Sequence, residues 1–262
     1  MKIFFIKKSY ILMLLFVLII SIFFIFVLNN RKSSLAIELS KNSTLSEDMI
    51  SKISELTNGS EKIAFLTFDD GPNALVTPKV LDILKEENVK ASFFVIGKNV
   101  DSHPEIVKRA YDDGHFIANH GYDHNNSILY KNSESFINEI KKTDLAIGNA
   151  IGIQDYCSHV FRFPNGFMSP NNKEKKKKAV KLLKDINYTY IDWNCLNNDS
   201  VKKYNNSQLL NNLKKTCKGK NTLVILMHDT KDVSNSSNVL KESIDYLKSE
   251  GYIFKNFYDI LE

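Results

Sequence analysis

The chain has 262 residues, 43% of them apolar and 11% aromatic, which is enough to bury a core in one large or two small domains and excludes a disordered protein. The net charge of +5 lies wholly in residues 1–34, which carry five basic residues and no acidic one. Residues 35–262 are therefore formally neutral (+5 minus +5), and we expect no nucleic-acid partner.

The N-terminal segment carries a long apolar run between basic residues. From Tyr10 to Leu28 only Ser21 interrupts it, and at about 1.5 Å per helical residue it nearly reaches the thickness of a membrane core. No small-residue cleavage site follows, so an uncleaved anchor is favoured over a signal peptide. The preceding lysines favour a body outside the membrane, although Arg31 and Lys32 oppose that orientation. We predict an anchor (1–34), a polar stalk (35–60) and a folded body (61–262) at the cell surface.

From residue 61, short apolar runs alternate with stretches of helical periodicity. The runs predict strands at IAFLTF (63–68), ASFFVIG (91–97), HFIANH (115–120), HVFRFP (159–164), YTYIDW (188–193), LVILMH (223–228) and YIFKNF (252–257). The intervening stretches predict helices over 77–88, 104–114, 133–150, 172–186, 206–217 and 237–249. Intervening helices imply parallel pairing, and unbroken apolar runs indicate strands covered on both faces. We expect one α/β domain, either a (β/α) barrel or a doubly wound sheet.

The cysteines and one lysine run also bear on the structure. Cys157, Cys195 and Cys217 have no Cys-x-x-Cys spacing, so three buried thiols are the default expectation, with one disulfide and one free thiol as the alternative. The lysine run 175–178 is interpreted as the solvated face of a helix, with contact to an acidic polymer as the alternative.

Polar side chains gather at the predicted strand ends, where parallel α/β proteins carry their sites. His120 and His124 can present two imidazoles to one metal ion, and a carboxylate from another strand end would complete a three-ligand set. Such an ion would absorb the charge of one aspartate of TFDDGP (67–72) and leave its neighbour ionised as a base. We interpret Asp229 as a helix cap. The strand-end residues are Asp69, Asp70, Asn119, His120, His124, Arg162, Asp192, His228 and Asp229.

Four motifs, in order along the chain, carry a resemblance to a known family. TFDDGP (67–72), HGYDH (120–124), RFPNG (162–166) and LMHD (226–229) resemble the polysaccharide deacetylases of carbohydrate esterase family 4, the NodB-homology domain, over about residues 61–257. The resemblance implies a distorted (β/α) barrel of seven or eight strands and a metal-dependent hydrolase. It implies one divalent ion, zinc first and cobalt or another divalent metal as alternatives, with the ligands Asp70, His120 and His124.

The same resemblance assigns the other roles. The catalytic set that it implies is Asp69 as base, Arg162 as the residue that orients it, His228 as general acid and Asp199 as the charge partner of His228. The substrate contacts that it implies are the backbone N–H of Asn165 at the oxyanion, together with Pro164, Leu226 and Trp193.

Two positions depart from the family pattern. Asn165 stands where an aromatic residue is usual, which changes the groove wall and leaves the backbone donor in place. The family's motif after the fifth strand commonly ends in Asp-Trp, and aligning WNCLNNDS (193–200) with it puts Asp199 on the aspartate and Ser200 on the tryptophan. Asp192 and Trp193 offer a second registration, which we favour less.

The function implied is removal of N-acetyl groups from a cell-surface aminosugar polymer, either peptidoglycan or a chitin-like glycan. Peptidoglycan N-acetylglucosamine is the expected substrate because the body is predicted to lie outside a membrane. An O-deacetylase of xylan or exopolysaccharide is the alternative within the same chemistry. Ser200 and Asn165 leave open a catalytically weak glycan-binding protein on the same scaffold. An iron oxygenase shares the two-histidine, one-carboxylate set but has no use for a second aspartate.

Overall fold

The computed structural model describes residues 62–230 and 236–261. The predicted anchor and stalk lie outside these residues. Among the helices that the structure describes, none has the length and apolar character needed to cross a membrane.

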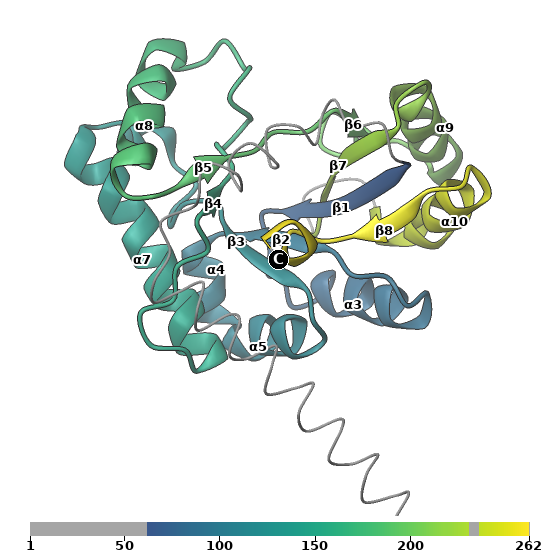
Figure 1. Ribbon diagram of the computed structural model, residues 1–262, viewed down its shortest axis with the longest axis horizontal. Helices are drawn as coiled ribbons and strands as arrows, with labels where there is room; N and C mark the ends of the chain where they lie inside the picture. Colours follow the sequence, from purple (N-terminus) through teal and green to yellow (C-terminus); the bar gives the residue numbers. More distant parts are fainter. Residues whose placement is uncertain (1–61, 231–235, 262) are drawn as a thin grey trace, which may run out of the picture. The chain divides into compact units, whose positions relative to one another are not determined.

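All eight strands of the described chain belong to one parallel sheet (Figure 1). Their order is β5-β4-β3-β2-β1-β7-β6, and β8 pairs with the first half of β1. The parallel α/β prediction is confirmed. In chain order the strands are β1 (Ile63–Asp69), β2 (Ser92–Val95), β3 (Phe116–Asn119), β4 (Val160–Phe161), β5 (Thr189–Tyr190), β6 (Cys195–Leu196), β7 (Thr222–His228) and β8 (Ile253–Lys255).

The two longest strands set the register that matters for the site. β1 and β7 pair along their whole lengths, from Ile63 opposite Thr222 to Asp69 opposite His228. Every residue of β7, and every residue of β1 after Ile63, is buried, as expected for central parallel strands. The register therefore places the last residues of both strands side by side at the carboxyl edge.

One strand was missing from the prediction. β6 contains only two residues and pairs with β7 through Cys195 and Leu196. A two-residue strand between polar residues shows no periodicity, so the seven expected strands became eight. β5 and β6 occupy the two ends of the strand order, and no pairing between them is found within the described residues.

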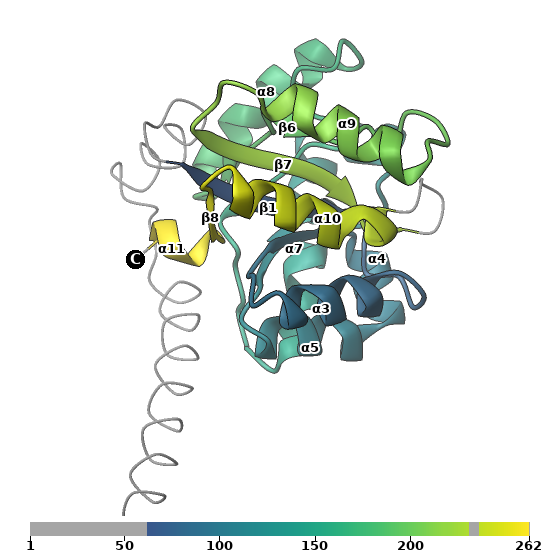
Figure 2. The same cartoon turned by 90° about the vertical axis from the view of Figure 1, so that its right-hand side faces the viewer.

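Helices lie alongside the sheet (Figures 1 and 2). α7 and α8 run beside β3 and β5, while α9 lies beside β6 and packs against α10. The six predicted helices are present. The described residues also contain three short helices that were not predicted, because four to six residues show too little periodicity. The helices are α3 (Thr77–Glu86), α4 (Gly97–Ser102), α5 (Pro104–Asp112), α6 (Asn126–Leu129), α7 (Ser133–Ile151), α8 (Lys173–Asp185), α9 (Asn206–Cys217), α10 (Ser236–Ser249) and α11 (Tyr258–Leu261).

The long helices have defined ends. The Asn132 side chain accepts the N–H of Ser135 at the start of α7, and Gly152, with φ of 75°, ends that helix. Asn205 and Gln208 form a reciprocal capping box at the start of α9. The two N-terminal caps therefore fix where the loops that follow β3 and β6 at the carboxyl edge end.

Aromatic side chains form the core behind the sheet. The Phe257 ring lies 5.7 Å from that of Phe65, 5.9 Å from that of Phe94 and 5.7 Å from that of Phe116. Pairs of this geometry add to the stabilisation from buried area. A second cluster, built around Phe136, Phe161 and Phe163, packs α7 and α8 against β4. The strand ends therefore project from a rigid base.

Two expectations about cysteine and lysine are corrected. Cys195 of β6 and Cys217, the last residue of α9, form a disulfide with a Cα–Cα distance of 5.2 Å, while Cys157 is free. The default of three thiols was wrong because sequence spacing does not reveal that β6 packs against the end of α9. Lys176, within the lysine run, is 2% exposed, so the run is not wholly a solvated face. It lies on the buried stripe of α8 with Ala179.

Candidate active site

The predicted site residues lie where the strands end. Asp69 and His228 are the last residues of β1 and β7. His120 directly follows β3, and Arg162 directly follows β4. Asp199 lies in the loop after β6. Parallel pairing brings these five ends to one edge of the sheet.

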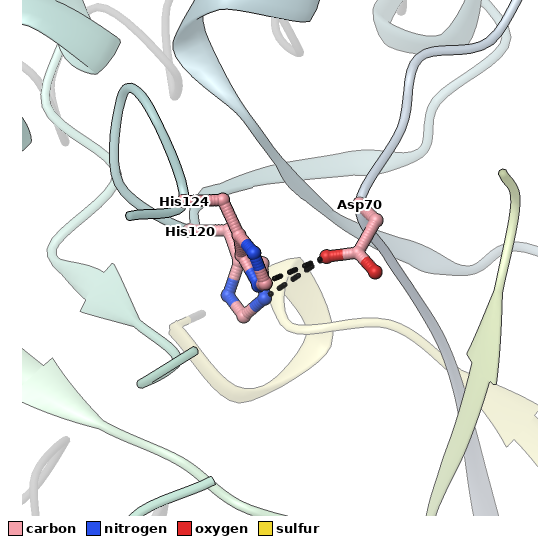
Figure 3. Close-up of side chains that lie close together, drawn as sticks. All are labelled: Asp70, His120 and His124. Carbon is pink, nitrogen blue, oxygen red and sulfur yellow. Dashed lines mark ion pairs between the residues drawn. The ribbon is translucent and has the colours of Figure 1, made fainter. Parts of the chain in front are cut away.

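Asp70, His120 and His124 converge at this edge (Figure 3). The Nε2 atom of His120 lies 3.4 Å from Asp70 Oδ1, and the Nε2 atom of His124 lies 3.3 Å from the same oxygen. One ligand atom from each residue falls within 4.8 Å of the others. Asp70 and His124 both adopt positive φ, 74° and 53°, which residues other than glycine rarely do. The loops are thus held in unusual conformations that point three metal-ligating groups at one place.

The donor chemistry of this triad fits a cation. His120 Nδ1 lies 2.8 Å from the carbonyl oxygen of Arg162, which only accepts, so Nδ1 carries the proton and Nε2 of the neutral ring carries a lone pair. That lone pair faces Asp70 Oδ1, a buried oxygen with no hydrogen-bond partner among the described residues. The lone pair and the orphaned carboxylate oxygen repel each other unless a cation lies between them.

The pKa values of the three side chains also favour a bound cation. Burial alone would raise the pKa of Asp70, but the nearby imidazoles of His120 and His124 hold it well below its usual range. Burial, followed by the charge of His120, lowers the pKa of His124. Burial also opposes a charge on His120, but Asp69 and Asp70 outweigh it and raise the pKa of His120. The pocket therefore attracts positive charge between its anionic and neutral ligands.

Asp69 is held by the buried guanidinium of Arg162. Arg162 Nη1 donates to Asp69 Oδ1 at 2.8 Å and to the hydroxyl of Thr67 at 2.7 Å. Arg162 is fully buried and Asp69 is 3% exposed. A charge-assisted bond to Oδ1 fixes the carboxylate and directs Oδ2 toward the triad, 3.8 Å from His120 Nε2.

The same guanidinium binds the segment that connects β5 to β6. Its Nε donates to the carbonyl of Ile191 at 3.1 Å, and its Nη2 donates to the carbonyl of Asp192 at 3.1 Å. Its carbon lies 3.9 Å from the centre of the Phe94 ring. Arg162 thus satisfies carbonyl groups of the segment that joins the two end strands of the sheet.

His228 is paired with Asp199. Its Nδ1 lies 2.7 Å from Asp199 Oδ1, and its backbone N–H donates to Oδ2 at 2.8 Å. The Ser236 hydroxyl also donates to Asp199 Oδ2. Burial alone would lower the pKa of His228, but the hydrogen bond and charge of Asp199 raise it to about 9. The contact of Asp199 corresponds to the first registration, while the Asp192 carboxylate accepts backbone N–H groups of Phe167 and Met168.

Among the described residues, the Asp229 carboxylate does not make the helix-cap contact that we expected. The carboxylate is fully buried, and Oδ2 accepts the Thr77 hydroxyl at 2.6 Å rather than a helical N–H. Burial raises the pKa of Asp229 to about 7. The carboxylate packs directly on Gly71, where any Cβ would overlap it. The glycine of TFDDGP is therefore required by this close approach.

The remaining predicted residues border the same edge. Leu226, on β7, and Pro164 are buried, and Asn165 is exposed with φ of 63°. The Trp193 ring lies over Gly166, close enough that a Cβ there would be 2.6 Å from it. Ser200 is exposed.

Asn119 and Glu139 support the HGYDH loop from below. Asn119 Oδ1 accepts the N–H of Gly121 at 2.9 Å. Glu139 of α7, 3% exposed, accepts the N–H groups of Tyr122 and Asp123 with one oxygen, each at 3.0 Å. Sequence reasoning missed Glu139 because an acidic residue on an amphipathic helix normally lies in solvent. Only its appearance at a position of the buried helix stripe could have indicated this role.

Comparisons with known proteins agree with this geometry. The chain matches the polysaccharide deacetylase family over residues 57–191. A peptidoglycan-N-acetylglucosamine deacetylase of Bacillus cereus is 35% identical over 77% of this chain and 72% of that protein. Another, from Listeria monocytogenes, is 35% identical over 72% of this chain but only 36% of that protein. The chain also spans only 64% of a further Bacillus cereus relative. A solved Streptococcus mutans CE4 esterase has a TM-score of 0.71 and 30% identity, covering 79% of this chain and 90% of that chain.

Proposed function

Since the chain belongs to the polysaccharide deacetylase family, we propose that it is a metal-dependent hydrolase that removes N-acetyl groups from peptidoglycan N-acetylglucosamine. The observation that carries the proposal is the convergence of Asp70, His120 and His124 beside a held carboxylate and a paired imidazole. Relatives with that printed activity support the substrate. We also propose the family's distorted (β/α) barrel as the fold to which the parallel sheet corresponds.

Asp70, His120 and His124 would hold one divalent ion, with zinc as the first candidate. A divalent ion bound there polarises the acetamide carbonyl and lowers the pKa of water. The two imidazoles and one carboxylate leave room for water and substrate, as catalytic sites of this kind require.

Asp69 acts as the general base. Its Oδ2 faces the triad, while Oδ1 is occupied by Arg162, so one oxygen remains to take a proton from the attacking water. Arg162 prevents the carboxylate from rotating and stabilises its charge. The neighbouring Asp70 then serves as the ligand of the cation, so the two adjacent aspartates have different roles.

His228 acts as the general acid. An amide nitrogen departs poorly as an anion, so the amine must receive a proton as the carbon–nitrogen bond breaks. Asp199 holds the imidazole through Nδ1 and leaves Nε2 to deliver that proton. A pKa of about 9 keeps the ring protonated at neutral pH. The products are acetate and a free amino sugar.

The loop after β4 completes the site. The backbone N–H of Asn165 would donate to the oxyanion that develops on the carbonyl oxygen. Leu226, at the β7 end of the site, would contact the acetyl methyl group, with Pro164 and Trp193 on the opposite wall.

The test is acetate release by the purified full chain from peptidoglycan, with mass spectrometry of the digested wall fragments. Acetyl removal should lower the mass of each N-acetylglucosamine by 42 units, and EDTA should abolish the reaction until metal is restored. The rate of acetate release should fall about 10²- to 10⁴-fold in His228→Ala. Release from O-acetylated xylan alone would favour the O-deacetylase. Saturable glycan binding with bound metal and no acetate would favour the glycan-binding alternative.

We further propose that the body acts outside the cytoplasmic membrane, held by an N-terminal transmembrane helix. The apolar run from Tyr10 to Leu28 supports an anchor, and the Cys195–Cys217 disulfide suits an oxidising compartment. Protease added to intact protoplasts should digest the body and spare a membrane-bound N-terminal fragment. Protection of the body would contradict this location.

A further inference from the structure

The loop of residues 165–169, which follows β4, is hydrogen-bonded by two charged side chains that have no part in the proposed reaction. At its tip Asn165 has a φ of 63°, and the N–H of Gly166 turns back to the carbonyl of Phe163 at 2.7 Å. Within the described residues nothing accepts the N–H of Asn165. In the proposed function that N–H meets the oxyanion, so the placement of this loop sets a contact made in the transition state.

Asp192 holds the N–H groups of the loop. Its two carboxylate oxygens each lie 3.0 Å from the N–H nitrogen of Phe167, and one lies 3.3 Å from that of Met168. Met168 is 83% exposed, so the backbone and not the side chain anchors this part of the loop. A carboxylate that accepts successive backbone N–H groups makes charge-assisted bonds stronger than neutral ones.

Lys176 holds the carbonyl groups of the same loop. Its Nζ donates to the carbonyl of Gly166 at 2.5 Å and to that of Ser169 at 3.3 Å. The side chain is 2% exposed, although its neighbours Lys175 and Lys177 are exposed. Burying an ammonium group is unfavourable unless it is hydrogen-bonded, so this lysine is committed to the loop. The loop thus binds a cation, Lys176, from α8 and an anion, Asp192, from the segment between β5 and β6.

Asp192 also connects the 165–169 loop to the general base Asp69. The backbone carbonyl of Asp192 accepts Nη2 of Arg162 at 3.1 Å, and Arg162 donates to Asp69 at 2.8 Å. The Trp193 ring covers Gly166 and lies 5.7 Å from the guanidinium. A displacement of Asp192 therefore moves both the oxyanion donor and the arginine that orients the base.

We propose that Lys176 and Asp192 are positioning residues that clamp the 165–169 loop from opposite sides and so set the oxyanion N–H of Asn165 relative to the base. The inference rests on the proposed deacetylase function. It assigns a role to Lys176 of the lysine run and to Asp192 at the strand end, two features that the metal and acid–base chemistry does not account for.

The test compares Lys176→Met and Asp192→Asn with the matched control Lys175→Met, using the full chain loaded with zinc. Acetate release gives kcat and KM separately, normalised to bound zinc so that unfolded protein does not count. We expect each clamp variant to lose roughly 10- to 100-fold in kcat with little change in KM or in zinc affinity, because the contact strengthens only in the transition state. The double variant should lose less than the product of the two, since both hold one loop.

Hydrogen exchange at the amides of Phe167 and Met168 gives a readout that does not depend on activity. Both amides should exchange faster in Asp192→Asn and in Lys176→Met, and at the unsubstituted rate in Lys175→Met. A kcat equal to that of the control, or a loss confined to KM or zinc affinity, overturns the inference alone. Should Lys176→Met fail to fold, Asp192→Asn decides the matter by itself. Absence of acetate release from the unsubstituted, zinc-loaded chain overturns the proposed function and this inference with it.

Discussion

The Glu139 side chain offers a test of how the metal-binding loop is held. The substitution Glu139→Gln keeps the shape of the side chain and removes its charge. In the structure one Glu139 oxygen accepts two backbone N–H groups of the HGYDH segment, each at 3.0 Å, between the ligands His120 and His124. Gln offers one neutral acceptor in place of that anion.

The expected magnitude follows from those two bonds. A hydrogen bond to a charged group contributes about 1.5 to 3 kcal/mol and a neutral one about 0.5 to 1.5, so the substitution weakens each by about 1 kcal/mol and the pair by about 2. If the loop must be ordered to present both imidazoles, this loss appears in metal binding. We therefore expect zinc affinity to fall roughly 10- to 100-fold.

The assay is a competition titration of metal-free protein against a chromophoric zinc chelator, with melting of the metal-free protein measured in parallel. Glu134→Gln, which removes a charge from an exposed position of the same helix, is the matched control and should bind zinc as the unsubstituted chain does. Unchanged zinc affinity in Glu139→Gln, with or without a lower melting temperature, would refute the reasoning.

Three further outcomes follow from the site and the fold. Asp199→Asn removes the main group that raises the pKa of His228, while Asp69 and Asp70 still raise it, so NMR titration of the metal-free protein should show that pKa lowered from about 9. Because the general acid works only when protonated, the fall in activity on the alkaline side of the pH–rate profile should then begin at a lower pH. An alkaline side that does not shift would contradict this. Arg162→Lys keeps the charge without the fork and should lower kcat roughly 10- to 100-fold with zinc affinity retained. Reduction of the Cys195–Cys217 bridge, of separation 22, should destabilise folding by about 3 kcal/mol, seen as a lower melting temperature, and an equal melting point with and without reductant would count against it.

The fold was readable from sequence wherever burial leaves a local pattern. β1 and β7 lie in the centre of a parallel sheet, so their residues form continuous apolar runs that cannot be mistaken for surface. β6 escaped because its two residues are held by pairing with β7 and by the disulfide, neither of which leaves a local signature. Whether β5 meets β6 depends on distant contacts in the same way.

Within the site, chemical type and spacing identified the groups that touch a cation or a substrate. The Asp-Asp pair and the two histidines are unusual enough to stand out in a single sequence. Glu139 and Lys176 are not unusual, because charged residues on helices are common and nothing local shows that these two point inward. Their partners lie in loops only 7 to 17 residues earlier in the chain, but the contacts form only when each helix packs against its loop.

The burial of Arg162 limits how such an enzyme can lose its activity during evolution. Removing the guanidinium would leave a buried carboxylate and the carbonyls of Ile191 and Asp192 without donors, which penalises folding as well as catalysis. Loss of the His228 imidazole, by contrast, leaves the buried Asp199 with two donors, the backbone N–H of residue 228 and the Ser236 hydroxyl. Descendants that keep the fold but abandon hydrolysis should therefore retain the arginine and change first at the proton donor. The presence of the arginine in a sequence then indicates that the chain can fold, and it does not show that the protein is an active enzyme.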